Sequence, residues 1–473
     1  EERRRTKLFR CMFPRRPLVV SLLASLIVMM TGAVEAQEFK AGVGRADITP
    51  TGPVRLAGYA SRTKPSSTID QHLFAKALAI QEASGQITLL ITADTIGTPR
   101  WFNDELAAQI EKELHVDRAH FVFACSHDHS SPVVHGGLTD MYGLSADEAE
   151  ATEKYTHFFL QRAFEAAQAA VQDLQPAALA FGRSEAFFAG NRRQFGPKGV
   201  QFGINPNGLV DRDVPVLRVM REDRSIKAIL FGYACHNTTP GPNDEISGDW
   251  AGYAQENLER TYPGATALFI TGCGADANPN PRGSLALARA HGLQLAGAVA
   301  RALSEPMSVV SGPIAAAFDR VDLPVDKTPD QAYYEAKLQE KAPATQRYAR
   351  RYLEMLARGE KFAASYPAPV QVLRFGHTLT LIALSGEVVA DYSFRLQREL
   401  PGEHLWNAAY CNDVFAYVPS MRILTEGGYE ADASIIYYGL PTRFAPAVED
   451  TLVHKILELV KRTGGTVPTP EKK

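Results

Sequence analysis

Short apolar runs, interrupted by amphipathic stretches, make up most of the chain. Runs of this kind predict buried strands, and residues 103–115 and 146–174 have the periodicity of amphipathic helices. Strands that alternate with helices predict an α/β fold, a layered mixed sheet covered by helices. The predicted strands are residues 41–50, 73–81, 86–94, 120–124, 177–183, 214–220, 226–233, 265–271 and 378–384.

Four of the predicted strands end in side chains that can carry chemistry. These side chains are His127, His236, Asp276 and Glu387. In sheets of this class, ligands bind at the carboxyl ends of the strands. We therefore expect the four side chains to meet at one edge of the sheet, which favours a metal site at that edge.

The first of these segments, Cys125-Ser126-His127-Asp128-His129-Ser130-Ser131-Pro132, holds two imidazoles two residues apart. Side chains with this spacing can point the same way into a crevice, and histidine is the commonest protein ligand for zinc. A pair of loop histidines, one of them bonded to Asp128, is the alternative interpretation. His236 could likewise be a core histidine, and Glu387 could stabilise the N-terminus of a following helix.

The first 36 residues have the pattern of a secretory signal peptide. Basic residues crowd positions 3–16, an apolar run follows at 18–30, and Ala33-Val34-Glu35-Ala36 offers small residues where a signal peptidase cuts. The apolar run is short for a membrane span, and an uncleaved anchor is the alternative. The pattern predicts cleavage after Ala36 and a secreted or periplasmic protein.

Composition and charge bound the rest of the chain. With 45% hydrophobic residues among 473, the chain can bury a sizeable core. A net charge of −3 without a basic face argues against nucleic acid as a partner. We expect one domain at residues 37–463 and a disordered tail at 464–473. A helical insertion at 327–365 is either a solvated hairpin or a lid.

Four cysteines beyond the predicted leader lie close to the candidate site segments: Cys125, Cys235, Cys273 and Cys411. In an exported chain two of them could form a disulfide. Small residues that fill tight space at strand ends are the alternative.

Five segments, met in order between about residue 40 and residue 446, resemble the neutral (non-lysosomal) ceramidases. Gly42-Val43-Gly44-Arg45-Ala46-Asp47 is similar to the opening of that family, and residues 127–132 are similar to its HTHSGP motif. The other three are Cys235-His236-Asn237-Thr238 with Ile246-Ser247-Gly248-Asp249, Ser385-Gly386-Glu387, and Asn412-Asp413-Val414-Phe415-Ala416-Tyr417-Val418. Each segment is a weak signal alone, and the ordered set is more specific.

The resemblance implies a zinc ion (Zn²⁺) held by His127, His236, Glu387 and Tyr417. Zinc lowers the pKa of bound water and polarises a carbonyl. His129 would lie beside the ion as proton donor to the leaving nitrogen, and Arg192 would stabilise the oxyanion. Tyr417 could instead be a packed aromatic residue, and Arg192 could pair with a surface carboxylate.

The sequence departs from the family at its GDxSPN motif. In the matching stretch, Asn278 stands where the family has serine. Asparagine is no nucleophile, but it can donate a hydrogen bond to an oxyanion, so Asn278 is a candidate catalytic residue. The chain also ends near the end of the matching region, so we expect no immunoglobulin-like C-terminal domain of the kind found in many ceramidases.

These features predict an exported zinc-dependent amidohydrolase that cleaves the amide bond of a small-molecule or lipid N-acyl compound, such as ceramide, with metal-activated water. Peripheral contact with a membrane would give access to a lipid substrate. In one alternative, the same metal site acts on an ester or a non-lipid amide. In the other, the chain is a catalytically silent binding protein on this fold.

Overall fold

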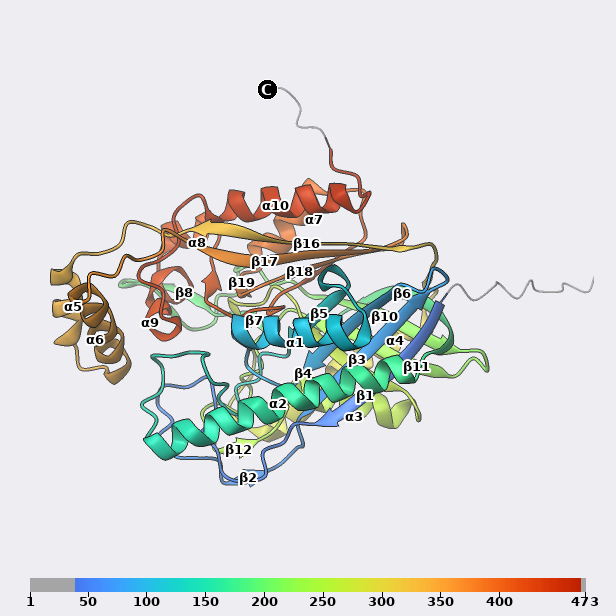
Figure 1. The fold of residues 1–473 in the computed structure, drawn as a ribbon, viewed down its shortest axis with the longest axis horizontal. Coiled ribbons are helices and arrows are strands. Elements are labelled where there is room, and N and C mark those ends of the chain that lie inside the picture. Colours follow the sequence, from blue (N-terminus) through green and yellow to red (C-terminus); the bar gives the residue numbers. More distant parts are fainter. Residues whose placement is uncertain (1–38, 469–473) are drawn as a thin grey trace, which may run out of the picture. The chain divides into compact units, whose positions relative to one another are not determined.

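The largest β-sheet forms the centre of the structure, a computed structural model that describes residues 39–468 (Figure 1). Eight of its nine strands follow the order β13-β11-β10-β6-β1-β3-β4-β5, and β15 pairs with β6. The pairs β4–β5 and β11–β13 are parallel, and the others are antiparallel. The strands are β1 (Phe39–Asp47), β3 (Phe74–Glu82), β4 (Ile87–Ala93), β5 (Phe121–Cys125), β6 (Gln175–Glu185), β10 (Asp213–Arg221), β11 (Ile226–Tyr233), β13 (Thr266–Thr271) and β15 (Ser308–Val310).

A second, four-stranded sheet has the order β16-β17-β18-β20. Its strands are β16 (Ile314–Pro324), β17 (Ser365–Phe375), β18 (Leu379–Leu384) and β20 (Leu405–Ala408). The backbone N–H of Ala409 donates to the carbonyl oxygen of Thr271 at 2.9 Å, which ties the end of β20 to the end of β13. The predicted strand 378–384 corresponds to β18 and so lies in this second sheet. The expectation that all site strands share one sheet edge is therefore wrong.

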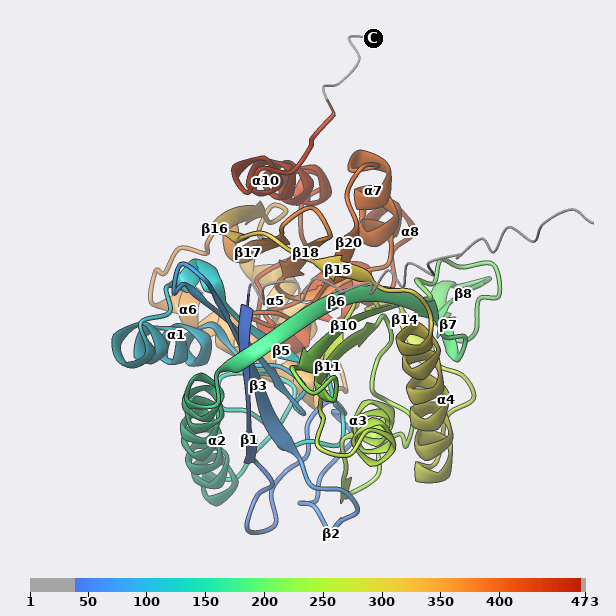
Figure 2. The same cartoon turned by 90° about the vertical axis from the view of Figure 1, so that its right-hand side faces the viewer.

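The structure has four layers in the order helix–sheet–sheet–helix (Figure 2). Side chains alternate between the two faces of a strand, so one face of the larger sheet packs against helices and the other against the second sheet. Leu89 and Ile91 of β4 pack in the same core as helix residue Phe102, while Leu90 packs with Leu381 of the second sheet. Strands buried on both faces read as continuous apolar runs, which is why the sequence pattern located them. The predicted α/β fold with a layered mixed sheet is confirmed.

The helices of the outer layers are α1 (Arg100–Leu114), α2 (Ala146–Gln172), α3 (Asp249–Thr261) and α4 (Leu285–Ser304) against the larger sheet, and α7 (Asp391–Glu399) and α10 (Val448–Arg462) beside the second sheet. Ser145 and Glu148 form a capping box that fixes the start of α2. The two predicted helices correspond to α1 and α2. Among residues 39–468, no helix combines the length and hydrophobicity that a membrane span requires.

Short elements connect these layers and carry much of the site. Four two-stranded pairs are β2 (Thr68–Ile69) with β12 (Glu245–Ile246), β7 (Ala189–Asn191) with β14 (Ala277–Pro279), β8 (Arg193–Gly196) with β9 (Gly199–Phe202), and β19 (Glu387–Val388) with β21 (Tyr417–Val418). The short helices are η1 (Arg118–His120), α8 (Met421–Glu426), the π-helical turn η2 (Tyr429–Ala433) and α9 (Ile435–Tyr438).

The predicted insertion contains two helices, α5 (Gln331–Leu338) and α6 (Pro343–Ala357). The hydroxyl groups of Tyr334 and Tyr348 donate to the carbonyl oxygen of Pro441, and that of Tyr352 donates to Gly439. The insertion therefore holds the chain that directly follows α9.

The four cysteines of the described chain are free and buried. The polar stretch Asn191-Arg192-Arg193-Gln194 is not a solvated loop, because β7 and β8 flank Arg192 and both arginines are buried. The predicted leader and the tail beyond residue 468 lie outside the described residues.

Candidate metal centre and active site

Two histidines enter the site just after strands of the larger sheet. His127 follows β5 with a φ of 58°, and its Nδ1 lies 2.7 Å from the carbonyl oxygen of Ile96. His236 follows β11, and its Nδ1 lies 3.1 Å from the carbonyl oxygen of Gly274. A carbonyl oxygen can only accept, so each Nδ1 carries the proton and donates it. Each Nε2 therefore turns a free lone pair toward the centre of the site.

Glu387 and Tyr417 enter from the second sheet's side of the molecule. β19 and β21 pair in parallel, which places Glu387 directly beside Tyr417. Gly386 makes the turn from β18 into β19 with a φ of 77°, and a Cβ there would lie 2.9 Å from the carbonyl oxygen of Ala416. Both facts explain the glycine in front of Glu387.

The four predicted ligand residues converge. Oε2 of Glu387 lies 3.1 Å from Nε2 of His127 and 3.1 Å from Nε2 of His236. The hydroxyl of Tyr417 lies 3.2 Å from Nε2 of His236. All four side chains are buried. The structure thus brings together every residue that the sequence proposed as a ligand.

Electrostatics favours a neutral His236. Burial, together with Arg192 and His127, lowers the pKa of His236 to about 3, so its imidazole is neutral near pH 7. Burial opposes ionisation of Glu387, and its pKa is held well below its usual range by protonated forms of His127 and His236, so the carboxylate calls for a positive charge between the imidazoles, either a proton or a cation. Neutral imidazoles and an ionised carboxylate are the ligand forms. Two nitrogens and hard oxygens around one point suit a zinc ion.

His129 is the third imidazole of this cluster. Its Nε2 lies 3.1 Å from Nε2 of His127, and the ligand atoms of His127, His129 and His236 all lie within 4.8 Å of one another, so the three could hold a metal ion. Unlike the other two, His129 has a buried Nδ1 without a hydrogen-bond partner among residues 39–468. Gly58 leaves it room, because a Cβ there would lie 2.1 Å from that Nδ1.

One property of His129 separates it from the two proposed ligand imidazoles. It lacks the backbone bond that orients a ligand imidazole. Burial and the neighbouring imidazoles of His127 and His236 hold its pKa well below its usual range, so it is neutral near pH 7, as His236 is.

Arg192 and Asn278 lie on the other side of Tyr417. Nη2 of Arg192 donates to the hydroxyl of Tyr417 at 3.0 Å, and Nη1 donates to Oδ1 of Asn278 at 3.3 Å. The hydroxyl of Thr238 donates to the same Oδ1 at 3.4 Å. With its oxygen occupied by two donors, Asn278 has its Nδ2 amide left to donate. Nε of Arg192 donates to Glu430 at 2.8 Å, so its carboxylate partner is buried and not on the surface.

A cavity of about 330 Å³ opens over these groups. His129, Arg192, Asn278 and Tyr417 contribute to its lining. Its size falls in the range of small-molecule sites. The rest of the lining includes Tyr59, Met141, Phe202, Arg282, Tyr429 and Tyr437.

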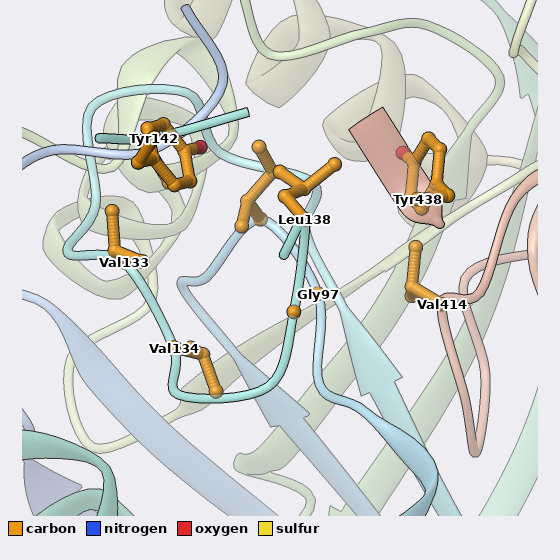
Figure 3. Close-up of a pocket in the computed structure, with 10 residues that line it drawn as sticks. Gly97, Val133, Val134, Leu138, Tyr142, Val414 and Tyr438 are labelled. Atoms are coloured by element: carbon orange, nitrogen blue, oxygen red, sulfur yellow. The ribbon is translucent and has the colours of Figure 1, made fainter. Parts of the chain in front are cut away.

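A second, apolar pocket lies beside the centre. Val133, Val134 and Leu138 line it from one loop, with Val414 and Tyr438 on the opposite side (Figure 3). Its free volume of about 10 Å³ has room for about one water molecule.

Comparison with known proteins identifies the relatives of this site. Residues 39–314 match the sequence model of the family described as neutral/alkaline non-lysosomal ceramidase, N-terminal. The chain belongs to this ceramidase family. A comparison with curated proteins found no significant match.

Two solved ceramidases share the fold of this family member. The neutral ceramidase from Pseudomonas aeruginosa is similar with a TM-score of 0.69 and 19% identity, over 92% of this chain and 76% of that chain. A structure described as a ceramidase complexed with C2 is similar with a TM-score of 0.69 and 19% identity, over 92% of this chain and 77% of that chain.

Three residues that the sequence analysis missed contact Glu387 or Arg192 in this member of the ceramidase family. The hydroxyl of Tyr438 donates to Oε1 of Glu387, and that of Tyr410 lies 3.4 Å from Oε2 of the same carboxylate. Glu430 accepts from both Arg192 and Arg193. None of the three stands in a recognisable motif, and only the fold brings them near the centre.

Asp276, which the sequence analysis placed among the site residues, links two segments that lie next to site residues. Its Oδ1 accepts from the backbone N–H of Ala390 at 2.9 Å, and its Oδ2 accepts from the side-chain amide of Asn191 at 3.0 Å. Asp276 therefore ties the segment before Arg192 to the start of α7. Asp128 accepts the backbone N–H of Ser130 instead of an imidazole proton.

Proposed function

We propose that the chain is an exported zinc-dependent amidohydrolase that cleaves the amide bond of an N-acyl compound, ceramide or a similar lipid. The observation that carries the proposal is the convergence of Nε2 of His127, Nε2 of His236 and Oε2 of Glu387 within hydrogen-bond distance. Family membership implies a hydrolase, and two similar folds belong to ceramidases. The signal-peptide pattern of residues 1–36 supports export.

His127, His236, Glu387 and Tyr417 would hold the zinc ion. When bound there, zinc supplies Lewis acidity that polarises the scissile carbonyl and lowers the pKa of water. Tyr410 and Tyr438 hold the Glu387 carboxylate in place, and outer hydrogen bonds of this kind fix the geometry of a ligand.

His129 moves the proton in this proposal. Its neutral imidazole accepts a proton from the attacking water as the new C–O bond forms. The same proton then passes to the amide nitrogen as the C–N bond breaks, which releases an amine and a carboxylic acid, and the acid then gives up its remaining proton to the amine or to solvent. The position of His129 in the cavity lining gives it access to both atoms.

Arg192 and Asn278 stabilise the negative charge that develops on the carbonyl oxygen. Both side chains line the cavity next to Tyr417, and Arg192 is held by Glu430 before substrate arrives. Preorganised donors of this kind stabilise a transition state without a reorganisation cost. Because Asn278 can donate but cannot attack a carbonyl, direct attack by water is the route that this residue permits.

Substitution of His236 tests the proposal. We expect His236→Ala to lose bound zinc and hydrolysis together, since it removes one of the two imidazoles proposed as ligands. Elemental analysis of the purified protein, combined with hydrolysis of an N-acyl-sphingosine, measures both. Stoichiometric zinc in the variant would remove His236 from the ligand set, and zinc-free parent protein without hydrolysis would favour a binding protein.

The size of the cavity favours a second candidate, hydrolysis of a small amide or ester at the same centre. About 330 Å³ is near the lower limit of small-molecule sites. A panel of short-chain esters and small amides, measured beside the N-acyl-sphingosine, separates the two candidates by their kcat/KM ratio.

A further inference from the structure

Arg282 places a positive charge in the wall of the active-site cavity that no carboxylate neutralises. Two arginines line this cavity, Arg192 and Arg282, and none of the described residues in its lining is an Asp or a Glu. The guanidinium of Arg192 is paired with the buried carboxylate of Glu430 at 2.8 Å. Arg282 is exposed, and it forms no ion pair with any residue between 39 and 468. Its charge is therefore available to a ligand in the cavity.

The acidic residue that feels the charge of Arg282 does not pair with it. Burial raises the pKa of Asp249 to about 6, and hydrogen bonds from backbone N–H groups and the charge of Arg282 oppose this rise. The two oxygens of Asp249 accept the backbone N–H of Thr239 at 2.7 Å and that of Trp250 at 2.6 Å. Asp249 thus spends its hydrogen-bonding capacity on the backbone and leaves the guanidinium free.

The chain on both sides of Arg282 is tied to the rest of the protein by three hydrogen bonds. These run from the N–H of Asn280 to the carbonyl of Phe188 at 2.7 Å, from Nε2 of His291 to the carbonyl of Pro281 at 2.7 Å, and from the N–H of Gly283 to the carbonyl of Thr239 at 2.6 Å. The imidazole of His291 is itself buried on α4. A segment that is already fixed loses little entropy when a ligand binds.

Tyr59 connects Arg282 to His129. Nη2 of Arg282 donates to the hydroxyl of Tyr59 at 3.0 Å, and the ring of Tyr59 lies 5.3 Å from the ring of His129 in an edge-to-face arrangement. Because the oxygen of Tyr59 accepts from Arg282, its own O–H is free to donate. Arg282 keeps the other N–H groups of a planar fork that matches the shape of a carboxylate. Together the two side chains offer several donors and a positive charge to one anion.

The position of His129 places this anion on one side of the scissile bond. In the proposed reaction His129 protonates the leaving nitrogen, so the neighbouring Tyr59 and Arg282 face the amine half of the substrate. We propose that Arg282 and Tyr59 bind a carboxylate carried by that amine half, which makes the substrate an N-acyl amino acid. Addition of one water across its C–N bond releases a carboxylic acid and an amino acid. The inference rests on the proposed function and narrows its substrate class.

A matched pair of substrates tests the charge preference. N-octanoylglycine and N-octanoylethanolamine share the acyl chain and the amide, and they differ in a carboxylate against a neutral alcohol. We expect kcat/KM of the parent to be about tenfold higher for the glycine compound, since charge-assisted hydrogen bonds are the strong ones. Arg282→Gln should lose this preference, and Arg282→Lys, which keeps the charge, should retain part of it.

The matched control is Arg350→Gln. Arg350 is exposed on α6 and does not line the cavity, so this variant changes the net charge of the protein by the same amount. We expect it to keep the parental preference. Equal kcat/KM of the parent for the two substrates, or a preference that Arg282→Gln retains in full, would overturn the inference.

Binding of an analogue that cannot be hydrolysed keeps this inference separate from the proposed function. In the ketone isostere of N-octanoylglycine a CH₂ group replaces the N–H, so calorimetric titration measures its affinity without turnover. The parent should bind this acid about tenfold more tightly than the corresponding alcohol, and Arg282→Gln should bind both alike. Such charge-selective binding without hydrolysis of any substrate would leave the anion site standing and remove the hydrolase. Hydrolysis of an N-acyl-sphingosine with equal binding of the two analogues would leave the hydrolase standing and remove the anion site.

Discussion

Glu430→Gln should destabilise the protein and misplace Arg192. The Glu430 carboxylate is 2% exposed and accepts from Arg192 at 2.8 Å and from Arg193 at 2.5 Å. Removing one partner of a buried ion pair costs roughly 3–5 kcal/mol. Arg193 keeps a second carboxylate, Glu426, but Arg192 keeps only the neutral groups of Tyr417 and Asn278. We therefore expect the free energy of unfolding to fall by about 3 kcal/mol, near the lower end of that range.

Thermal and urea unfolding measure this loss. With an unfolding entropy of roughly 2.1 cal/mol/K per residue, a domain of this length should lose only about 3 °C in Tm for 3 kcal/mol. Urea titration is therefore the sharper assay. Glu426→Gln is the control, because Glu426 is 19% exposed and should cost less than about 1 kcal/mol. Stability of Glu430→Gln within about 0.5 kcal/mol of the parent would refute the reasoning.

The pH dependence of this difference has a definite sign. Burial opposes ionisation of Glu430, but Arg192 and Arg193 hold its pKa below its usual value. A depressed folded-state pKa contributes stability above the unfolded value, and this contribution is lost as pH falls through the folded value. The gap between parent and Glu430→Gln should therefore be full near pH 7 and shrink below about pH 4.5.

Two further predictions concern His129 and Asp413. His129→Ala should keep stoichiometric metal and slow turnover by roughly 10²–10⁴-fold, since it removes the proton carrier; elemental analysis that finds no metal would make His129 a ligand. Burial raises the pKa of Asp413 to about 6, although Tyr366 and Arg100 oppose the shift. The free energy of unfolding of the parent should therefore fall by up to about 3 kcal/mol as the pH rises from about 4 to 6. Asp413→Asn should lack this decline in urea unfolding, and equal slopes for parent and variant would contradict the assignment.

Strand positions, and the candidate side chains at the strand ends, could be predicted from the sequence because both depend on local pattern, whereas Tyr417 and Arg192 are proposed only from the resemblance to the ceramidases. The run 226–233 coincides with β11, and His236 follows it as expected. What the pattern could not show is which sheet a strand joins. The run 378–384 is as apolar as the others, and only its pairing with β17 and β20 separates it from them.

The burial of Arg192 and Arg193 could not be predicted from the sequence. Asn191-Arg192-Arg193-Gln194 is polar, and a polar stretch normally predicts a solvated loop. Both arginines are buried because Glu430 lies 238 residues beyond Arg192 in the chain and meets it only in the fold. A pairing of such long range leaves no trace in local periodicity.

The distances along the chain between the site residues have a consequence for how the protein would acquire its metal. The chain between His236 and Tyr417 spans 181 residues, yet the two side chains meet in the folded protein. Contacts of such long range form late in folding. A site that uses both His236 and Tyr417 is complete only when the chain has folded, so binding of a metal to all four proposed ligands would be coupled to folding.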